Sequence, residues 1–361
     1  MERKNKFKSK HSYFLSLAFE QAKNNLGSTK SNPSVGCIVE KDDSVISSGY
    51  TSFNGRPHAE YNALNKKINF RNSNLYVTLE PCSHYGVTPP CTNLINKKKI
   101  KKVFFSTYDS DKRSQKKSKN ILKNQNISVS SQLLKKEGKE FYESYFLQHS
   151  KKLPLIDVKI AISKDYFTIN KKKRWITNIH SRKRSHVIRS TYNCLISTSK
   201  SINYDNSILN CRIEGLEKKC PDLVILDRNL KLKKNLKLFN NMKYRKILLV
   251  TCKNDSKKLS FFKSRGVKII KVGQLNSFKD YKDLFFKLKK KYSRILVEAG
   301  LNFTNFLIKN KLIKNIYIFQ SSYKLKNQGT NNSSANIIKK IKLKNQISVN
   351  LFGDQIYKEK I

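Results

Sequence analysis

The stretch that decides the fold reads H-A-E at residues 58–60 and E-P-C-S-H-Y-G-V-T-P-P-C at residues 80–91. It brings one imidazole, one carboxylate and two thiols into a short segment. A catalytic zinc ion takes three protein ligands and keeps its fourth position for water. His58, Cys82 and Cys91 supply three such ligands, and Glu60 remains free to move protons between water and a substrate. The stretch therefore predicts a catalytic zinc site.

Helix geometry restricts where this site can lie. Residues two apart lie about 200° apart around a helix, so His58 and Glu60 can share a site only in front of a helix N-terminus. Pro57 suits a first helical position, and Pro81 and Pro90 directly precede the two cysteines. Thiols at helix starts have a lowered pKa and bind metal readily. We therefore expect three segment starts to converge on one ion.

Three alternative roles fit the same side chains. They are a buried structural histidine, inert core cysteines, or a structural zinc ion with His84 as a fourth ligand. The order H-x-E, strand, P-C and P-C favours the catalytic site over all three. The same order, with the carboxylate outside the metal shell, is typical of zinc deaminases that act on nucleobases.

The composition indicates two domains and no membrane segment. The chain has 361 residues, enough for two domains, and no apolar run approaches the length of a membrane span. Its first 11 residues are polar and basic, and no apolar segment typical of a secretory signal follows them. Seven scattered cysteines, an odd number, indicate a reducing compartment, most simply the cytoplasm.

The net charge of +50 is the most conspicuous property of the composition. A basic chain suggests a polyanionic partner, but here lysine is spread over the whole length together with asparagine and isoleucine. These three residues share A/T-rich codons, so coding bias is sufficient to account for the charge. We expect no specific nucleic-acid partner, only nonspecific contacts at low salt.

Strands and helices alternate in the first half of the chain. We predict helices at 12–26, 58–66, 92–99, 115–124 and 132–146, and strands at 35–39, 45–48, 75–79, 103–105 and 127–129. This alternation predicts an α/β domain whose site lies at strand-to-helix junctions. Pro154 opens a new apolar run, so we place the boundary between domains 1–150 and 151–361.

The second half alternates again. We predict a helix at 178–189, strands at 194–197, 223–226, 247–250, 267–271, 295–298 and 316–319, and surface excursions at 231–246 and 324–346. Neither G-x-x-x-x-G-K nor G-x-G-x-x-G occurs, so an ordinary dinucleotide fold is not predicted. The run R-I-L-V-E-A-G-L-N-F at 294–303 can hold a phosphate on the backbone of its turn. On spacing alone, an ordinary strand-to-helix turn is the simpler interpretation.

A family resemblance joins these features. The runs N-P-S-V-G-C at 32–37, H-A-E at 58–60 and T-L-E-P-C-S-H-Y-G-V-T-P-P-C at 78–91 resemble the bifunctional riboflavin biosynthesis deaminase/reductase family. The eight-residue gap between Cys82 and Cys91 separates the chain from cytidine and tRNA-adenosine deaminases, which typically have P-C-x-x-C. The resemblance implies a cytidine-deaminase-like three-layer domain followed by a dihydrofolate-reductase-like domain.

The resemblance also implies activities and ligands. The first domain would use Zn²⁺ to deaminate 2,5-diamino-6-ribosylamino-4(3H)-pyrimidinone 5′-phosphate, and the second would use NADPH to reduce the ribosyl chain to a ribityl chain. The implied assembly is a homodimer. The implied cofactor-binding residues are Ala161, Trp175, Ser201, Asp205 and Gly300, and the implied substrate-binding residues are Lys173, Arg189, Leu209, Arg212 and Glu298.

The chain departs from the family pattern at several places. Tyr166 stands where the family usually has glycine, Lys173 replaces serine, and Asn206, Leu301 and Val87 replace an aspartate, a proline and a basic residue. These departures keep open a deaminase with a degenerate reductase half. The charge keeps open a nucleic-acid deaminase or a basic nucleic-acid-binding protein.

Overall fold

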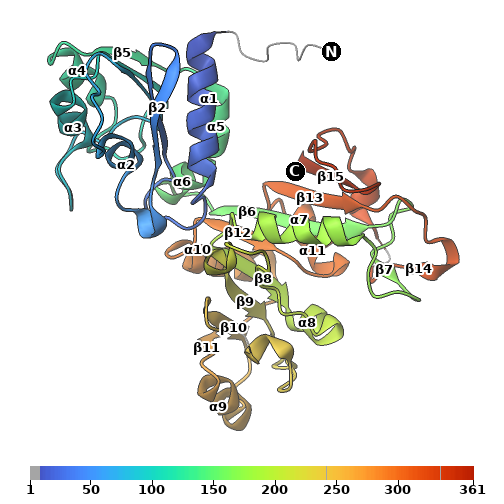
Figure 1. Ribbon diagram of the computed structural model, residues 1–361. Coiled ribbons are helices and arrows are strands. Elements are labelled where there is room, and N and C mark those ends of the chain that lie inside the picture. Colours follow the sequence, from blue (N-terminus) through green and yellow to red (C-terminus); the bar gives the residue numbers. More distant parts are fainter. Residues whose placement is uncertain (1–8, 241, 334) are drawn as a thin grey trace. The chain divides into compact units, whose positions relative to one another are not determined.

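The computed structural model describes residues 9–240, 242–333 and 335–361 (Figure 1). The chain divides into two compact units, and the division falls between Lys152 and Leu153. Each unit has its own sheet and its own buried apolar core. Within the described residues, no helix is both long and apolar enough to cross a membrane.

The first unit is built on a five-stranded sheet of order β2-β1-β3-β4-β5. Its strands are β1 (Gly36–Lys41), β2 (Ser44–Tyr50), β3 (Asn74–Leu79), β4 (Lys102–Thr107) and β5 (Ser128–Ser131). Its helices are α1 (Lys10–Lys23), α2 (Ala59–Leu64), α3 (Cys91–Lys97), α4 (Ser118–Lys123), α5 (Lys135–Phe141) and α6 (Glu143–Gln148). Strand β1 is antiparallel to β2 and β3, whereas β3, β4 and β5 are parallel.

Two glycines show that helices cover both faces of this sheet. A Cβ atom at Gly36 would lie 1.9 Å from the carbonyl oxygen of Ala18 in α1, and one at Gly49 would lie 2.4 Å from that of Ala59 in α2. Gly49 pairs with Cys37, the neighbour of Gly36, so the two glycines face opposite sides of the sheet. Each glycine lets a helix approach its strand closely, and the predicted three-layer arrangement is confirmed.

The second unit is built on an eight-stranded sheet of order β11-β10-β9-β8-β12-β6-β13-β15. Its strands are β6 (Leu155–Ile162), β8 (Cys194–Thr198), β9 (Asp222–Leu226), β10 (Ile247–Thr251), β11 (Lys268–Lys271), β12 (Arg294–Val297), β13 (Asn315–Gln320) and β15 (Gln355–Lys360). Its helices are α7 (Ile179–Arg189), α8 (Ser199–Asp205), α9 (Ser256–Ser264), α10 (Phe278–Lys289) and α11 (Leu301–Lys309). The two-residue strands β7 (Ile169–Asn170) and β14 (Gly329–Thr330) pair separately.

All pairs in the large sheet are parallel except β13 with β15. Parallel strands that are covered on both faces read as continuous apolar runs, as in I-L-L-V at 247–250. The neighbours Leu195 and Ile196 of β8 belong to two different buried clusters, one on each face of the sheet. The predicted α/β class is confirmed for both units.

Several predicted elements need correction. The helix predicted at 132–146 begins at Lys135 and is interrupted at Tyr142, which separates α5 from α6. Leu134, just before α5, has a φ of +48°, so the chain leaves the helical path there. Helix α8 and strand β15 were not predicted at all, because short polar segments lack a clear apolar period.

The prediction that 231–246 and 324–346 are surface excursions holds for most of their described residues, but a few side chains of each segment are buried. Leu232 and Leu238 are fully buried, and Arg245 is only 6% exposed. Leu325 and Ile338 are likewise buried in the second segment. The few apolar residues of each segment are the ones that pack inward. Their burial could not be predicted from the sequence, because lysines predominate around them.

Candidate functional site

The three expected metal ligands lie around one point of the first unit. His58 is the N-cap residue of α2, and Cys91 is the first residue of α3, with Pro90 as its N-cap. Cys82 lies in the loop after β3 rather than at a helix start, and Pro57 precedes the cap of α2 rather than opening the helix. Both details differ from the prediction, but the convergence of three segments is observed.

The distances within this group match the geometry of a zinc site. His58 Nδ1 lies 3.7 Å from Cys82 Sγ and 3.5 Å from Cys91 Sγ, and all three atoms fall within 4.8 Å of one another. Tetrahedral zinc with ordinary Zn–N and Zn–S bonds separates such atoms by about 3.6 Å. The donor set and its spacing therefore fit zinc.

The electrostatics favour a thiolate in this group. A hydrogen bond from the Cys91 thiol lowers the pKa of Cys82 to about 4, and the backbone N–H of Cys91 also donates to Cys82 Sγ at 3.2 Å. The contact with Cys82 raises the pKa of Cys91, and the hydrogen bond with Cys82 raises the pKa of His58. The site thus stabilises the sulfur anion that metal binding requires.

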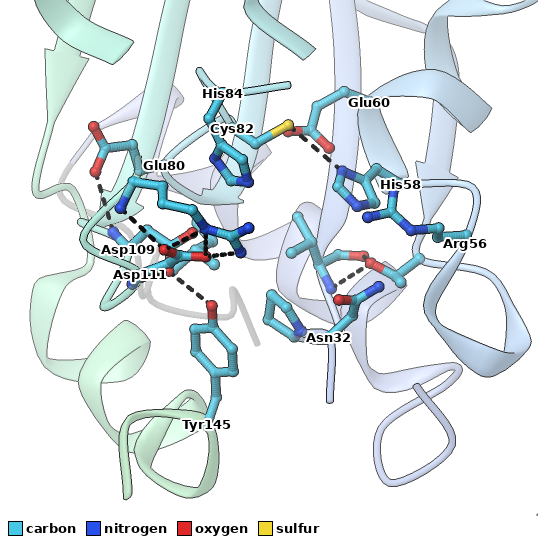
Figure 2. Close-up of a pocket in the computed structure, with 15 residues that line it drawn as sticks. Asn32, Arg56, His58, Glu60, Glu80, Cys82, His84, Asp109, Asp111 and Tyr145 are labelled. Carbon is cyan, nitrogen blue, oxygen red and sulfur yellow. Dashed lines mark hydrogen bonds and ion pairs between the residues drawn. The ribbon is translucent and has the colours of Figure 1, made fainter. Parts of the chain in front are cut away.

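Glu60 lies beside the three ligands without being one of them. Its side chain is 4% exposed, and burial together with the Cys82 charge raises its pKa to about 7. Figure 2 shows the carboxylate of Glu60 and the imidazole of His58 pointing towards Cys82. A carboxyl group with a pKa near neutrality can both accept and return a proton.

His58, Glu60 and Cys82 line a pocket of the first unit (Figure 2). Its polar walls include Asn32, Arg56, His84, Asp109, Asp111 and Tyr145. His84 is not part of the metal-binding group among the described residues, and its Nδ1 lies 2.7 Å from Ser114 Oγ. A site with three protein ligands and an adjoining pocket is a catalytic rather than a structural arrangement.

Glu80 holds one wall of the pocket, a role that the sequence analysis missed. Its buried carboxylate accepts hydrogen bonds from the backbone N–H groups of Asp109, Lys116 and Ser118 at 2.9–3.2 Å, and from Ser118 Oγ at 2.8 Å. Burial raises the pKa of Glu80, whereas these donors oppose the rise. A carboxylate at the end of a buried strand, directly before Pro81, was the available signal.

In the second unit, Arg189 and Glu298 lie together at the end of β12. Arg189 donates to Glu298 Oε1 at 2.5 Å and to Oε2 at 2.9 Å, and Lys159 Nζ lies 3.0 Å from Oε2. Burial alone would raise the pKa of Glu298, but the two cations hold it well below its usual value. Lys159, on β6, was missed by the sequence analysis because a lone lysine within an apolar strand carries no motif.

Ser201 and Gly300 also meet, at the carboxyl ends of β8 and β12. The N–H of Gly300 donates to Ser201 Oγ at 3.1 Å, and the N–H of Leu301 donates to Asn332 Oδ1 at 3.0 Å. A Cβ atom at Gly300 would lie 2.4 Å from Asn332 Nδ2, so a side chain there would have to displace the Asn332 amide. Hydroxyl and N–H groups at the start of α11 fit the phosphates of NADPH, which would take over these two N–H groups.

Trp175 and Asp205 lie close to the same arginine. Trp175 is 47% exposed, and its ring lies 4.8 Å from the guanidinium of Arg174 and 4.9 Å from that of Arg182. Arg174 also donates to the backbone carbonyl of Asp205 at 2.5 Å. Burial raises the pKa of Asp205, and the charges of Arg174 and Lys159 oppose this rise. Two guanidinium groups therefore lie over this half-exposed indole.

The remaining predicted residues lie around this region in different environments. Leu209 is buried with a φ of +56°, and its carbonyl accepts from Arg245 at 2.5 Å. Arg212 is exposed and donates to Asn210 Oδ1 at 2.9 Å. Lys173 is exposed, and its side chain has no polar contact among the described residues. Ala161 lies within β6, opposite Phe319 of β13.

Tyr166, the departure from glycine, adopts the backbone conformation that glycine favours. Its φ is +69°, and its carbonyl accepts a hydrogen bond from Asn336 Nδ2 at 3.0 Å. A left-handed non-glycine residue costs about 1–2 kcal/mol. The turn therefore persists despite the replacement.

Sequence and structure comparisons agree with this arrangement. Residues 8–107 match the cytidine and deoxycytidylate deaminase zinc-binding region, and residues 154–344 match the RibD C-terminal domain. The chain is 30% identical to riboflavin biosynthesis protein RibD of Aquifex aeolicus over 310 residues, covering 85% of each chain. It is 31% identical to RibD of Actinobacillus pleuropneumoniae over 297 residues, covering 81% of this chain and 78% of the relative.

Solved structures give the same result. A diaminohydroxyphosphoribosylaminopyrimidine deaminase/5-amino-6-(5-phosphoribosylamino)uracil reductase from Thermotoga maritima aligns with a TM-score of 0.80 and 26% identity, over 97% of this chain and 98% of that one. RibD of Acinetobacter baumannii aligns with a TM-score of 0.79 and the same identity and coverage. The chain therefore belongs to the RibD family of riboflavin biosynthesis enzymes, which combine a zinc-dependent deaminase domain with an NADPH-dependent reductase domain.

Proposed function

We propose that residues 1–150 deaminate 2,5-diamino-6-ribosylamino-4(3H)-pyrimidinone 5′-phosphate and that residues 151–361 reduce the ribosyl chain of the product. The observation that supports this proposal most strongly is the group of His58 Nδ1, Cys82 Sγ and Cys91 Sγ. The buried carboxylate of Glu60 lies beside this group. These three residues would hold zinc, which supplies Lewis-acid activation of water when bound. The substrate is a small pyrimidine nucleotide.

Glu60 is the proton carrier of this proposal. Its carboxylate takes a proton from the attacking water and delivers protons to the ring nitrogen and to the departing amine, which leaves as ammonia. Burial keeps the carboxyl group next to the ligands and raises its pKa to about 7, so both protonation states are accessible near neutral pH. The polar walls of the pocket orient the ring.

In the second unit, the residues at the carboxyl ends of β8 and β12 would bind NADPH and the substrate. Ser201, Gly300, Trp175, Asp205 and Ala161 are proposed for the cofactor side. The substrate side would use Arg189, Arg212, Glu298, Leu209 and Lys173. NADPH, when bound, supplies the hydride. The ion pair of Arg189 with Glu298 fixes both side chains, so neither needs to be ordered when the substrate arrives.

The setting of the enzyme is a further part of the proposal. Seven cysteines without a disulfide among the described residues suit a reducing cytoplasm. We also propose a homodimer, on the family resemblance. No specific nucleic-acid partner is proposed, because the pocket chemistry suits a small nucleotide and the charge is spread along the chain.

The test follows ammonia release and NADPH oxidation separately, with and without NADPH. Glu60→Gln should lower ammonia release by about 10²–10⁴-fold while zinc content stays near one per chain. Full ammonia release by this variant would contradict the role of Glu60. Ammonia release without any NADPH oxidation by the wild-type enzyme would contradict the reductase half of the proposal.

A further inference from the structure

Arg56 lies at the rim of the deaminase pocket and has no acidic partner among the described residues. Its side chain is half-buried and lines the pocket, and in the sequence it stands two residues before His58. Its Nη1 donates to Thr88 Oγ1 at 2.8 Å, a neutral hydroxyl. Within residues 9–240, 242–333 and 335–361 it forms no ion pair. Figure 2 shows Arg56 beside His58, across the pocket from Asp109 and Tyr145.

The second amine of Arg56 borders a niche above Gly86. Arg56 Nη2 lies 3.7 Å, and His84 Nε2 lies 3.9 Å, from the position where a Cβ atom of Gly86 would stand. The other ring nitrogen of His84 is held at 2.7 Å from Ser114 Oγ, which directs Nε2 towards the niche. Both distances are ordinary van der Waals contacts, so this niche is only one methyl group deep, with a guanidinium on one side and an imidazole nitrogen on the other.

The charges around the pocket single out Arg56 as an anion ligand. The neighbouring loop, residues 83–90, contains no lysine or arginine. Arg113, the other arginine of the pocket, donates to both carboxylate oxygens of Asp111 at 2.5–3.0 Å, so its charge is already neutralised. Among the described residues that line the pocket, Arg56 is therefore the arginine left available for an anion, on a rim that also carries Asp109 and Asp111.

We infer that Arg56 binds the phosphate group of the pyrimidine substrate at the pocket rim, in front of the niche above Gly86. The inference rests on the proposed function, since it gives the deaminase substrate its phosphate. A guanidinium presents paired N–H groups that match phosphate oxygens bidentately. With the ring over the metal-binding group, Arg56 sets the preference for a phosphorylated over a dephosphorylated substrate.

The experiment measures kcat/KM for ammonia release by the full-length zinc enzyme on the substrate and on its dephosphorylated form. Arg56→Gln should lower kcat/KM for the phosphorylated substrate by about 10- to 100-fold, the loss expected for charge-assisted hydrogen bonds, and lower kcat/KM for the dephosphorylated form much less. Arg56→Lys should lose less. Arg71→Gln, an exposed arginine of the same unit, is the matched control and should behave as wild type.

A second measurement covers the case in which the dephosphorylated substrate reacts too slowly. Ribose 5-phosphate should inhibit ammonia release by the wild type and by Arg71→Gln, and Arg56→Gln should weaken this inhibition about 10-fold or more. Equal losses on both substrates, or unchanged inhibition, would overturn the inference. Wild-type enzyme that releases no ammonia would instead refute the proposed function, so the two failures are distinguishable.

Discussion

Replacing Glu298 with glutamine should destabilise the second unit strongly. The change removes one negative charge and keeps the size of the side chain. Glu298 is 8% exposed, and it is paired with Arg189, which is 10% exposed, and Lys159, which is 17% exposed. Without the carboxylate, two cations remain close together in a protein interior with no counter-charge. Desolvation of an unpaired charge is what makes such a change costly.

The magnitude follows from the number and length of these contacts. Three contacts of 2.5, 2.9 and 3.0 Å join the carboxylate to its two partners. Breaking a buried pair by removing one partner costs about 3–5 kcal/mol. For a unit of this size, about 2–4 °C in Tm corresponds to 1 kcal/mol, so we expect a loss of about 6–20 °C.

The chain contains its own reporter for this measurement. Trp175 is the only tryptophan, and it belongs to the second unit. Tryptophan fluorescence during urea or thermal unfolding therefore follows the second unit alone, which avoids treating a two-domain chain as a single transition. Circular dichroism of the whole chain serves as a comparison.

The matched control is Glu214→Gln, the same chemical change at an exposed glutamate of the same unit. We expect it to stay within about 0.5 kcal/mol of wild type. A Glu298→Gln variant that loses less than about 1 kcal/mol would refute the reasoning. Such a result would mean that water reaches the cations and screens them, contrary to their burial.

Three further predictions concern the metal, the acid range and the helix packing. Cys82→Ser should lose stoichiometric zinc and ammonia release together, measured by metal analysis of the purified protein; retained zinc would contradict the ligand assignment. Burial and the charge of Arg189 lower the pKa of His186 from 6.5 to about 4. As the pH falls, His186 is therefore protonated in the unfolded chain before it is protonated in the folded protein. The free energy of unfolding should therefore fall as the pH drops from 6.5 towards 4. Urea unfolding should show a smaller fall for His186→Gln than for the wild type. Equal pH profiles of the two proteins would contradict this role of His186. Gly36→Ala should cost about 2 kcal/mol or more, because its Cβ would meet the backbone of Ala18 in α1; an unchanged Tm would refute this.

Much of the fold and the zinc site could be predicted from the sequence. Buried parallel strands read as apolar runs, so their positions and the α/β class followed directly from the pattern. The metal ligands and Glu60 were predicted as one group because their residue types and order fit zinc chemistry. The apolar run that Pro154 opens placed the boundary near 150, and the chain divides after Lys152.

Contacts between distant segments were decided only by the tertiary structure. Lys159 reaches Glu298 across 139 positions of sequence, and Arg56 reaches the loop of Thr88 without any motif to announce it. Segment 231–246 is mostly exposed, but a few of its leucines are buried, which its lysine-rich composition did not indicate. Side-chain type and spacing report local geometry, whereas long-range pairing depends on how strands are ordered in a sheet. The sequence by itself determined which chemistry was present, and the packing of the sheets decided which charges meet and which remain available for a ligand.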